Sequence, residues 1–130
     1  MAFLINGFFY QKKRFLDVAV QSEVEGGAAA FINSQLFRTM FAGIIYPDPD
    51  NQNFLIGQIM DHYGESFLNN VKLSEIELEF EKCYSHRCDT IKYEFTLNNG
   101  IYMGRYSGEA VGGGEARCII TPAPENFFNF

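Results

Sequence analysis

Two runs of alternating apolar and polar side chains constrain the fold of this chain more than any other feature. Apolar residues alternate with glutamates between positions 76 and 81, and with charged or polar residues between positions 91 and 97. A repeat of two places successive side chains on opposite faces of a β-strand. Asn98-Asn99-Gly100 follows the second run and supplies residues that tolerate positive φ in a tight hairpin turn. The pattern predicts paired antiparallel strands with one buried face.

Similar runs extend this pattern along the chain. Two prolines predict a loop over residues 46–51, and three consecutive glycines predict a turn at 112–114. Six of the twelve glycines lie between residues 100 and 114, where glycine lets a strand bend or approach its neighbour closely. About eight strands joined by short turns favour an antiparallel up-and-down β-barrel. The other expected strands cover residues 1–9, 15–24, 54–61, 67–72, 101–108 and 116–121.

Residues 28–41 form the exception to the strand pattern. Apolar residues from Ile32 to Phe41 recur at helical spacing, and three alanines precede them. We therefore expect one short helix over 28–41, lying on the barrel wall or across one end. A strand is the alternative, because Thr39 and the aromatic residues around it also suit a pleated sheet.

Length and charge set further bounds on this chain. Its 130 residues fit a single domain spanning residues 1–130. The net charge of −6 argues against a nucleic-acid partner, since phosphate binding needs a concentrated basic face. The apolar N-terminal segment lacks a preceding basic region and is too short to cross a bilayer, so we interpret it as a strand and expect no membrane partner. We expect a cytoplasmic location, with Cys83, Cys88 and Cys118 as reduced thiols.

Two glycine-punctuated strands, one of them aromatic, carry a resemblance to a known group. They are Gly57-Gln58-Ile59-Met60-Asp61-His62-Tyr63-Gly64 and Gly100-Ile101-Tyr102-Met103-Gly104-Arg105-Tyr106-Ser107-Gly108. The rhythm of residues 54–121, about half of the chain, resembles that of the calycin barrels: lipocalins, fatty-acid-binding proteins and avidin-like proteins. The resemblance implies a barrel able to hold a ligand. The chain contains no Trp, so it lacks the lipocalin Gly-x-Trp signature and an avidin-type biotin site.

The aromatic content supports a hypothesis about function. The chain has fourteen Phe and seven Tyr, which can line a ligand cavity or fill a barrel. We expect a non-enzymatic barrel that binds a small apolar ligand and needs no cofactor. The residues that we place nearest such a cavity are Phe80, Tyr93, Phe95, Tyr102 and Tyr106.

One cluster of residues suggests catalysis. Asp61, His62 and Glu65 are acid and base groups at a predicted strand end, where they would suit general acid–base chemistry. A lone His beside Asp in a turn is more often a capping or surface pair. We therefore favour a function that is not enzymatic.

A second cluster suggests a metal. Cys83, His86 and Cys88 are soft metal ligands close together in the sequence, but their spacing lacks a second Cys/His pair to complete a metal site. We therefore expect no metal. An exposed hairpin loop with two cysteines at its base is the simpler interpretation, and a cross-strand disulfide between them would be possible on oxidation.

The alternative function is that of an interaction or assembly domain. Exposed apolar residues of the 28–41 segment, or the aromatic tail at residues 126–130, would then form a homodimer contact. The glutamates between residues 75 and 81 are expected to form a solvated face, which Lys92 or Lys82 neutralises across the ladder.

Overall fold

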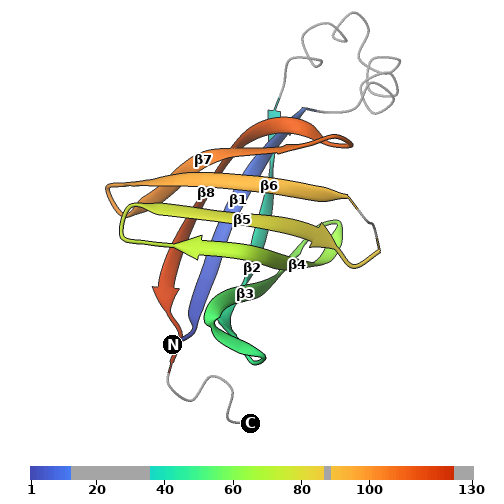
Figure 1. The fold of residues 1–130 in the computed structure, drawn as a ribbon. Helices are drawn as coiled ribbons and strands as arrows, with labels where there is room; N and C mark the ends of the chain where they lie inside the picture. The colour runs from blue at the N-terminus through green and yellow to red at the C-terminus, as the bar shows by residue number, and fades with distance from the viewer. Residues whose placement is uncertain (13–35, 87–88, 125–130) are drawn as a thin grey trace, which may run out of the picture.

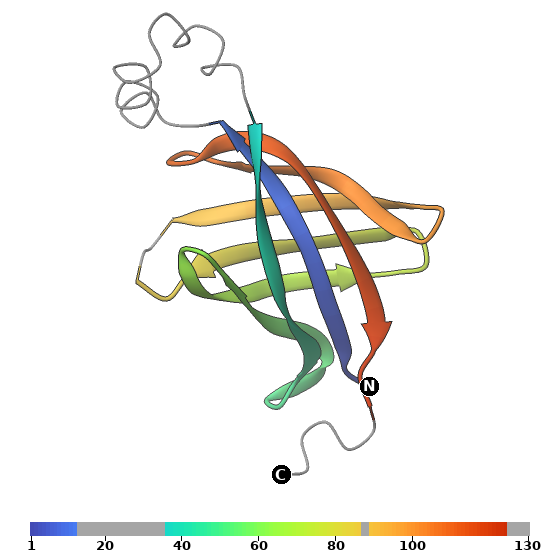
Figure 2. The same cartoon turned by 180° about the vertical axis from the view of Figure 1, so that it is seen from behind.

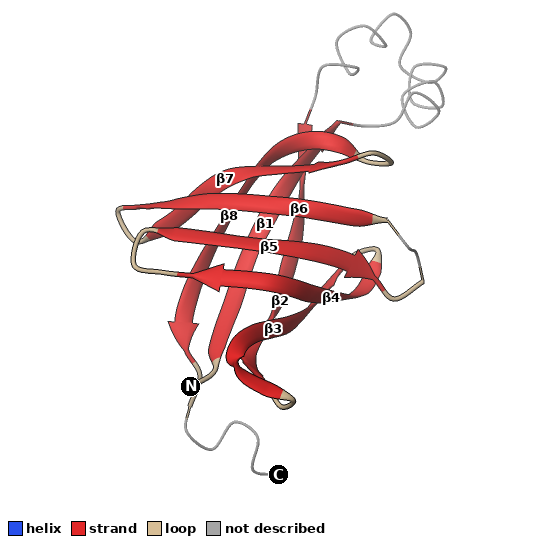
Figure 3. Cartoon of the chain, viewed as in Figure 1, coloured by secondary structure: helices blue, strands red, loops and turns tan. Residues whose placement is uncertain are grey.

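The protein is an eight-stranded, closed, antiparallel β-barrel (Figure 1). The computed structural model describes residues 1–12, 36–86 and 89–124. Each strand pairs with the next in sequence, and β8 pairs with β1 to close the sheet. The predicted up-and-down barrel is therefore confirmed, and within these residues no helix occurs (Figure 3). The strands are β1 (Phe3–Lys12), β2 (Leu36–Asp48), β3 (Asn51–Asp61), β4 (Gly64–Leu73), β5 (Glu77–Tyr84), β6 (Thr90–Asn98), β7 (Ile101–Gly108) and β8 (Gly112–Pro122).

The two alternating runs form β5 and β6, as the sequence predicts. Every second residue of β5 is buried from Leu78 to Tyr84, and in β6 Ile91, Tyr93 and Phe95 are buried at the same spacing. The predicted hairpin turn connects β6 to β7, with Asn99 at φ 52° and Gly100 at φ 82°. Both residues thus adopt the left-handed conformation that Asn and Gly tolerate best.

Gly104 allows β7 to lie very close to β6. A Cβ atom at this position would come within 1.7 Å of the backbone oxygen of Glu94, which no side chain could tolerate. The register between the two strands runs without interruption past this point, so Tyr102 and Tyr106 share the inner face of the barrel. Glycine here permits the coiling of the sheet while keeping both tyrosines inside.

The predicted helix over residues 28–41 is wrong for residues 36–41, which belong to β2. Residues 28–35, and the strand predicted over 15–24, lie outside the described residues. Along β2 the buried side chains are Thr39, Phe41 and Ile45, which follow a repeat of two rather than the helical repeat. Pairing with β1 over ten residue pairs satisfies the backbone of this segment and overrides its helical propensity.

Two predicted turns are also displaced. The loop expected over residues 46–51 shrinks to a turn at Pro49 and Asp50, because β2 continues through Pro47 to Asp48. Pro47 is tolerated there since the ladder shifts register between Pro47 and Asp48, and bulges accommodate a residue that cannot donate. The turn expected at residues 112–114 lies just before the glycines, at 109–111, and β8 begins at Gly112.

The barrel has two distinct ends, which we call the terminal end and the far end. At the terminal end lie Phe3 of β1, Pro122 of β8 and the turn between β4 and β5. At the far end β1 finishes at Lys12, and β2 begins there at Leu36. Figure 2 shows β1, β2 and β8 running between these ends on the side of the barrel opposite β5 and β6.

Candidate functional site

Stacked aromatic rings fill the middle of the barrel. The ring of Tyr93 stacks on that of Phe80 with centroids 4.9 Å apart, on that of Tyr106 at 5.6 Å and on that of Phe95 at 5.9 Å. All four side chains are at most 5% exposed. Four of the five residues that we predicted to be nearest a cavity therefore occupy the space themselves, and room for a ligand must be sought at the ends.

An apolar groove of about 410 Å³ opens at the terminal end. The fifth predicted residue, Tyr102, contributes to its wall, and its hydroxyl donates a hydrogen bond to the backbone oxygen of Ser74 at 3.1 Å. Several lining residues are half-buried and pack against the core. The groove is lined by Phe3, Leu55, Leu73, Ser74, Glu75, Tyr102, Ile120 and Pro122.

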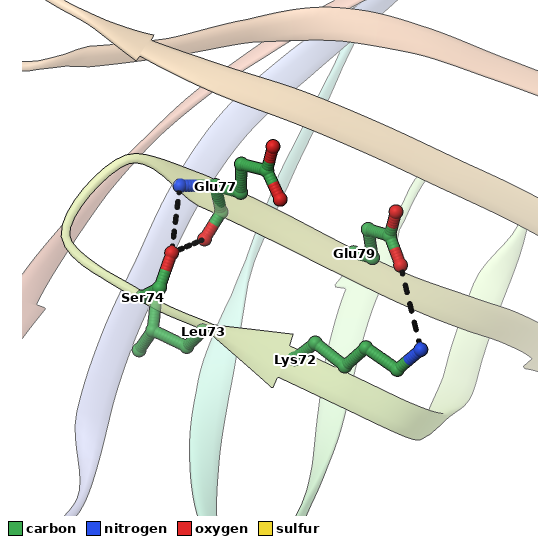
Figure 4. A pocket seen from close by; sticks show the side chains of 5 residues that line it. All are labelled: Lys72, Leu73, Ser74, Glu77 and Glu79. Atoms are coloured by element: carbon green, nitrogen blue, oxygen red, sulfur yellow. Dashed lines mark hydrogen bonds and ion pairs between the residues drawn. The ribbon is translucent and has the colours of Figure 1, made fainter.

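A second, smaller hollow of about 230 Å³ adjoins this groove on the outer wall (Figure 4). Ser74 caps the turn there, because its hydroxyl oxygen accepts a hydrogen bond from the backbone N–H of Glu77 at 3.0 Å. Lys72 and Glu79 form an ion pair at 3.9 Å, with the lysine side chain 78% exposed. An exposed ion pair contributes little stability. We interpret this hollow as solvated surface around a capped turn.

A buried ion pair lies toward the far end of the barrel. The Lys82 ammonium from β5 lies 2.6 Å from the Asp61 carboxylate at the end of β3, and both side chains are fully buried. The Tyr84 hydroxyl donates to the same carboxylate oxygen at 2.6 Å, and the backbone N–H of Tyr63 donates to the other oxygen at 2.7 Å. β4 separates β3 from β5, and its inward Ser66 is small enough to leave room for this contact.

Three aromatic rings lie close to the Lys82 ammonium. The ammonium nitrogen lies 4.4 Å from the ring centroid of Tyr84, 4.8 Å from that of Phe9 and 5.6 Å from that of Tyr93. The negative faces of such rings attract a cation most strongly where water is excluded. This environment offsets part of the cost of removing the charge from water.

Burial shifts the pKa values of this cluster. It lowers the pKa of the Lys82 ammonium from its usual 10.5, while the hydrogen bond and charge of Asp61 oppose that change. It raises the pKa of the Tyr84 phenol, and Asp61 raises it further, because a second negative charge beside the carboxylate is unfavourable. Burial likewise raises the pKa of Tyr93.

Further hydrogen bonds tie this end of the barrel together. The side-chain oxygen of Gln11 accepts from the Thr39 hydroxyl at 2.8 Å and from the Tyr63 hydroxyl at 2.9 Å. The Tyr106 hydroxyl donates to the backbone oxygen of Tyr10. Throughout the described part of the chain, each buried side-chain nitrogen or oxygen has a partner. The cluster is therefore a satisfied network that links β1, β2, β3 and β5.

The three candidate acid and base residues are placed in different environments. Asp61 points inward to Lys82, whereas Glu65 is exposed and opposes the outward Met60. His62 is exposed, with its ring 5.3 Å from that of Tyr63. The Asp61 carboxylate thus already interacts with the Lys82 ammonium and the Tyr84 phenol.

The candidate metal ligands lie at the β5–β6 hairpin. Cys83 is half-buried, and its thiol donates to the backbone oxygen of Tyr84 at 3.8 Å. His86 is exposed beside the Tyr84 ring, and Cys88 lies outside the described residues. Over residues 1–12, 36–86 and 89–124, no group of His, Cys, Asp and Glu gathers that could hold a metal ion.

The sequence did contain a signal for Lys82 that we interpreted wrongly. We expected Lys82 on the outer face beside the glutamates, but it follows Leu78 and Phe80 at intervals of two and so lies on the inner face. Continuing the inward series of Leu78 and Phe80 by two residues predicts that Lys82 is buried. On the outer face, Lys92 lies 3.2 Å from Glu94 and opposes Glu81 in the ladder, so it does face the glutamates.

No protein-family model, curated protein or solved structure matches this chain. The fold itself defines the class of the protein: an eight-stranded antiparallel up-and-down barrel, as the calycin resemblance implies. Among the described residues there is no helix long and apolar enough to cross a membrane.

Proposed function

We propose that this protein is a calycin-like barrel that binds a small, mainly apolar molecule in the groove at its terminal end. The observation that carries the proposal is the groove itself: about 410 Å³, walled by half-buried apolar side chains from several strands. Ligand pockets in proteins commonly measure about 300–1,000 Å³ and combine apolar walls with a few polar groups.

The chemistry of the lining indicates the kind of ligand. Phe3, Leu55, Leu73 and Ile120 offer apolar contacts, so the hydrophobic effect would supply most of the binding free energy. Glu75 is the one carboxylate in the lining. A carboxylate there disfavours an anionic ligand and favours a neutral molecule, or one with a single hydrogen-bond donor.

The aromatic filling of the barrel limits ligand size. Phe80, Tyr93 and Tyr106 close the barrel below the groove, so a long acyl chain has no path along the axis. The proposal therefore favours a compact molecule held at the mouth rather than a fatty acid held in the interior.

Binding of N-phenyl-1-naphthylamine, a neutral dye that fluoresces in apolar surroundings, tests the proposal. We expect the dye to bind the wild-type protein, and Ile120→Trp to weaken binding at least tenfold because the larger ring fills the groove. Ile119→Trp is the matched control. Ile119 immediately precedes Ile120 in β8 and is 44% exposed on the outer face, so this variant should leave the dye affinity unchanged. Equal binding by both variants, or none by the wild type, would refute the proposal.

A further inference from the structure

The outer wall of the barrel has two chemically different halves. On β5 and β6 it is acidic, with Glu77, Glu79, Glu81 and Glu94 facing outward. On β1 to β4 it carries an apolar surface, which we call the β1–β4 patch. The patch consists of Phe8, Met40, Ala42, Ile44, Met60 and Phe67.

The strand register makes the β1–β4 patch continuous. Phe8 of β1 opposes Met40 of β2, and Ala42 of β2 opposes Met60 of β3. Phe67 of β4 lies one step diagonally from Met60. Met40 is 64% exposed, Met60 55% and Phe67 43%. Contiguous exposed apolar surface of this kind is typical of a protein–protein contact.

Opposite charges border the patch on its two sides. The Arg38 guanidinium carbon lies 5.2 Å from the ring centroid of Phe8, and Arg117 of β8 opposes Phe8 on its other side. On β4, the exposed Glu65 opposes Met60. One border is therefore cationic and the other is anionic.

We propose that the β1–β4 patch is the surface through which two copies of this chain associate with two-fold symmetry. A two-fold axis that lies in the contact plane and runs along the strands brings each border against the opposite border of the second copy, so Arg38 and Arg117 meet Glu65. The acidic outer faces of β5 and β6 then point away from the contact. This arrangement reduces the repulsion between two copies that each carry a net charge of −6.

The closed sheet determines how the two copies meet. Because β1 pairs with β8, the eight described strands form a closed sheet, and the contact that we propose forms through side chains. Met40 belongs to the 28–41 segment in which the sequence suggested a dimer contact. This interface uses the outer wall and is independent of the ligand groove at the terminal end.

Sedimentation velocity of the full chain over a wide range of concentrations tests this proposal. We expect a dimer, and we expect Met40→Lys and Met60→Lys each to weaken association at least tenfold, because the new ammonium groups would be desolvated in the contact. The matched control is Ile76→Lys: Ile76 is also 64% exposed but lies in the β4–β5 turn, and its variant should remain dimeric. Far-UV circular dichroism establishes that each variant is folded.

Charge reversal tests the symmetry of the contact. Glu65→Arg should weaken the dimer, and adding Arg38→Glu should restore it. A strict monomer at all concentrations, or a dimer that tolerates both Met40→Lys and Met60→Lys, would overturn the proposal. A dimer lost only on deletion of residues 126–130 would also overturn it, and would assign association to the C-terminal tail.

Discussion

The two ends of the barrel are completed by opposite kinds of side chain. At the terminal end, half-buried apolar residues such as Leu73 and Ile120 leave a groove open. Toward the far end, Lys82 and Asp61 bury full charges and satisfy each other. An apolar groove keeps its surface available to a ligand, whereas a buried ion pair is already committed to its partners. We therefore expect changes at the far end to affect stability and changes at the terminal end to affect binding.

Removing one member of the ion pair should have the largest effect. Asp61→Ala leaves the Lys82 ammonium buried without its carboxylate, and losing one partner of a buried pair costs about 3–5 kcal/mol. Chemical denaturation followed by circular dichroism measures this loss. The double variant Asp61→Leu with Lys82→Met removes both charges and should be more stable than Asp61→Ala alone. If Asp61→Ala is as stable as the wild type, the pair does not hold the far end together.

Alkaline pH should destabilise the protein, because several of its tyrosines are buried. Burial raises the pKa values of Tyr84 and Tyr93, so above the ordinary tyrosine pKa of 10 the unfolded chain loses protons that the folded protein retains. Stability is then lost at about 1.4 kcal/mol per pH unit for each such tyrosine. The lowered pKa of Lys82 acts in the opposite direction only below 10.5.

Thermal unfolding measured from pH 7 to 11 checks this expectation. Below pH 10 the contribution of these buried tyrosines is fully present, and above 10.5 stability should fall steadily. The Tyr84→Phe variant should show a shallower fall, since it removes one of the groups whose pKa burial raises. An identical pH dependence in that variant and in the wild type would contradict the assignment.

The same substitution at each end gives the most direct comparison. Tyr84→Phe removes a hydrogen bond to a buried carboxylate, which contributes about 1.5–3 kcal/mol. Tyr102→Phe removes a hydrogen bond to the Ser74 backbone oxygen, which contributes about 0.5–1.5 kcal/mol. Urea denaturation measures both, and dye binding should change only in the Tyr102 variant. A larger loss of stability in Tyr102→Phe than in Tyr84→Phe would contradict the expectation that the far end contributes more to stability than the terminal end.

The sequence predicted strands best where both periodicity and turn chemistry agreed. β5, β6 and their turn at Asn99 and Gly100 follow the alternation directly. β2 was not predicted as a strand: a loop was expected at its end, and the short apolar run at its start fits a repeat of two and a helical repeat almost equally well. Only its pairing with β1 decides between them, and pairing depends on a strand that is distant in the sequence.

The candidate site was predicted only in part, for a related reason. Tyr102 contributes to the wall of the groove, whereas Tyr93 and Phe80, which also point inward, fill the middle of the barrel. Alternation specifies the inner face but not the depth of a side chain along the barrel axis. Asp61 attracted attention as an acid in the sequence, but its partner Lys82 lies two strands away.

By itself, the sequence determined the strands that alternate cleanly, the hairpin turn after β6 and the inward orientation of Phe80, Tyr93 and Phe95, because backbone sterics and the repeat of two act over short distances. Tertiary structure alone decided which end stays open and which holds charge. Closure of β8 on β1 curves the sheet, and curvature brings inward side chains of non-adjacent strands together. The contact of Lys82 with Asp61 across β4 is a consequence of that curvature, and so is the groove between Leu55, Tyr102 and Ile120.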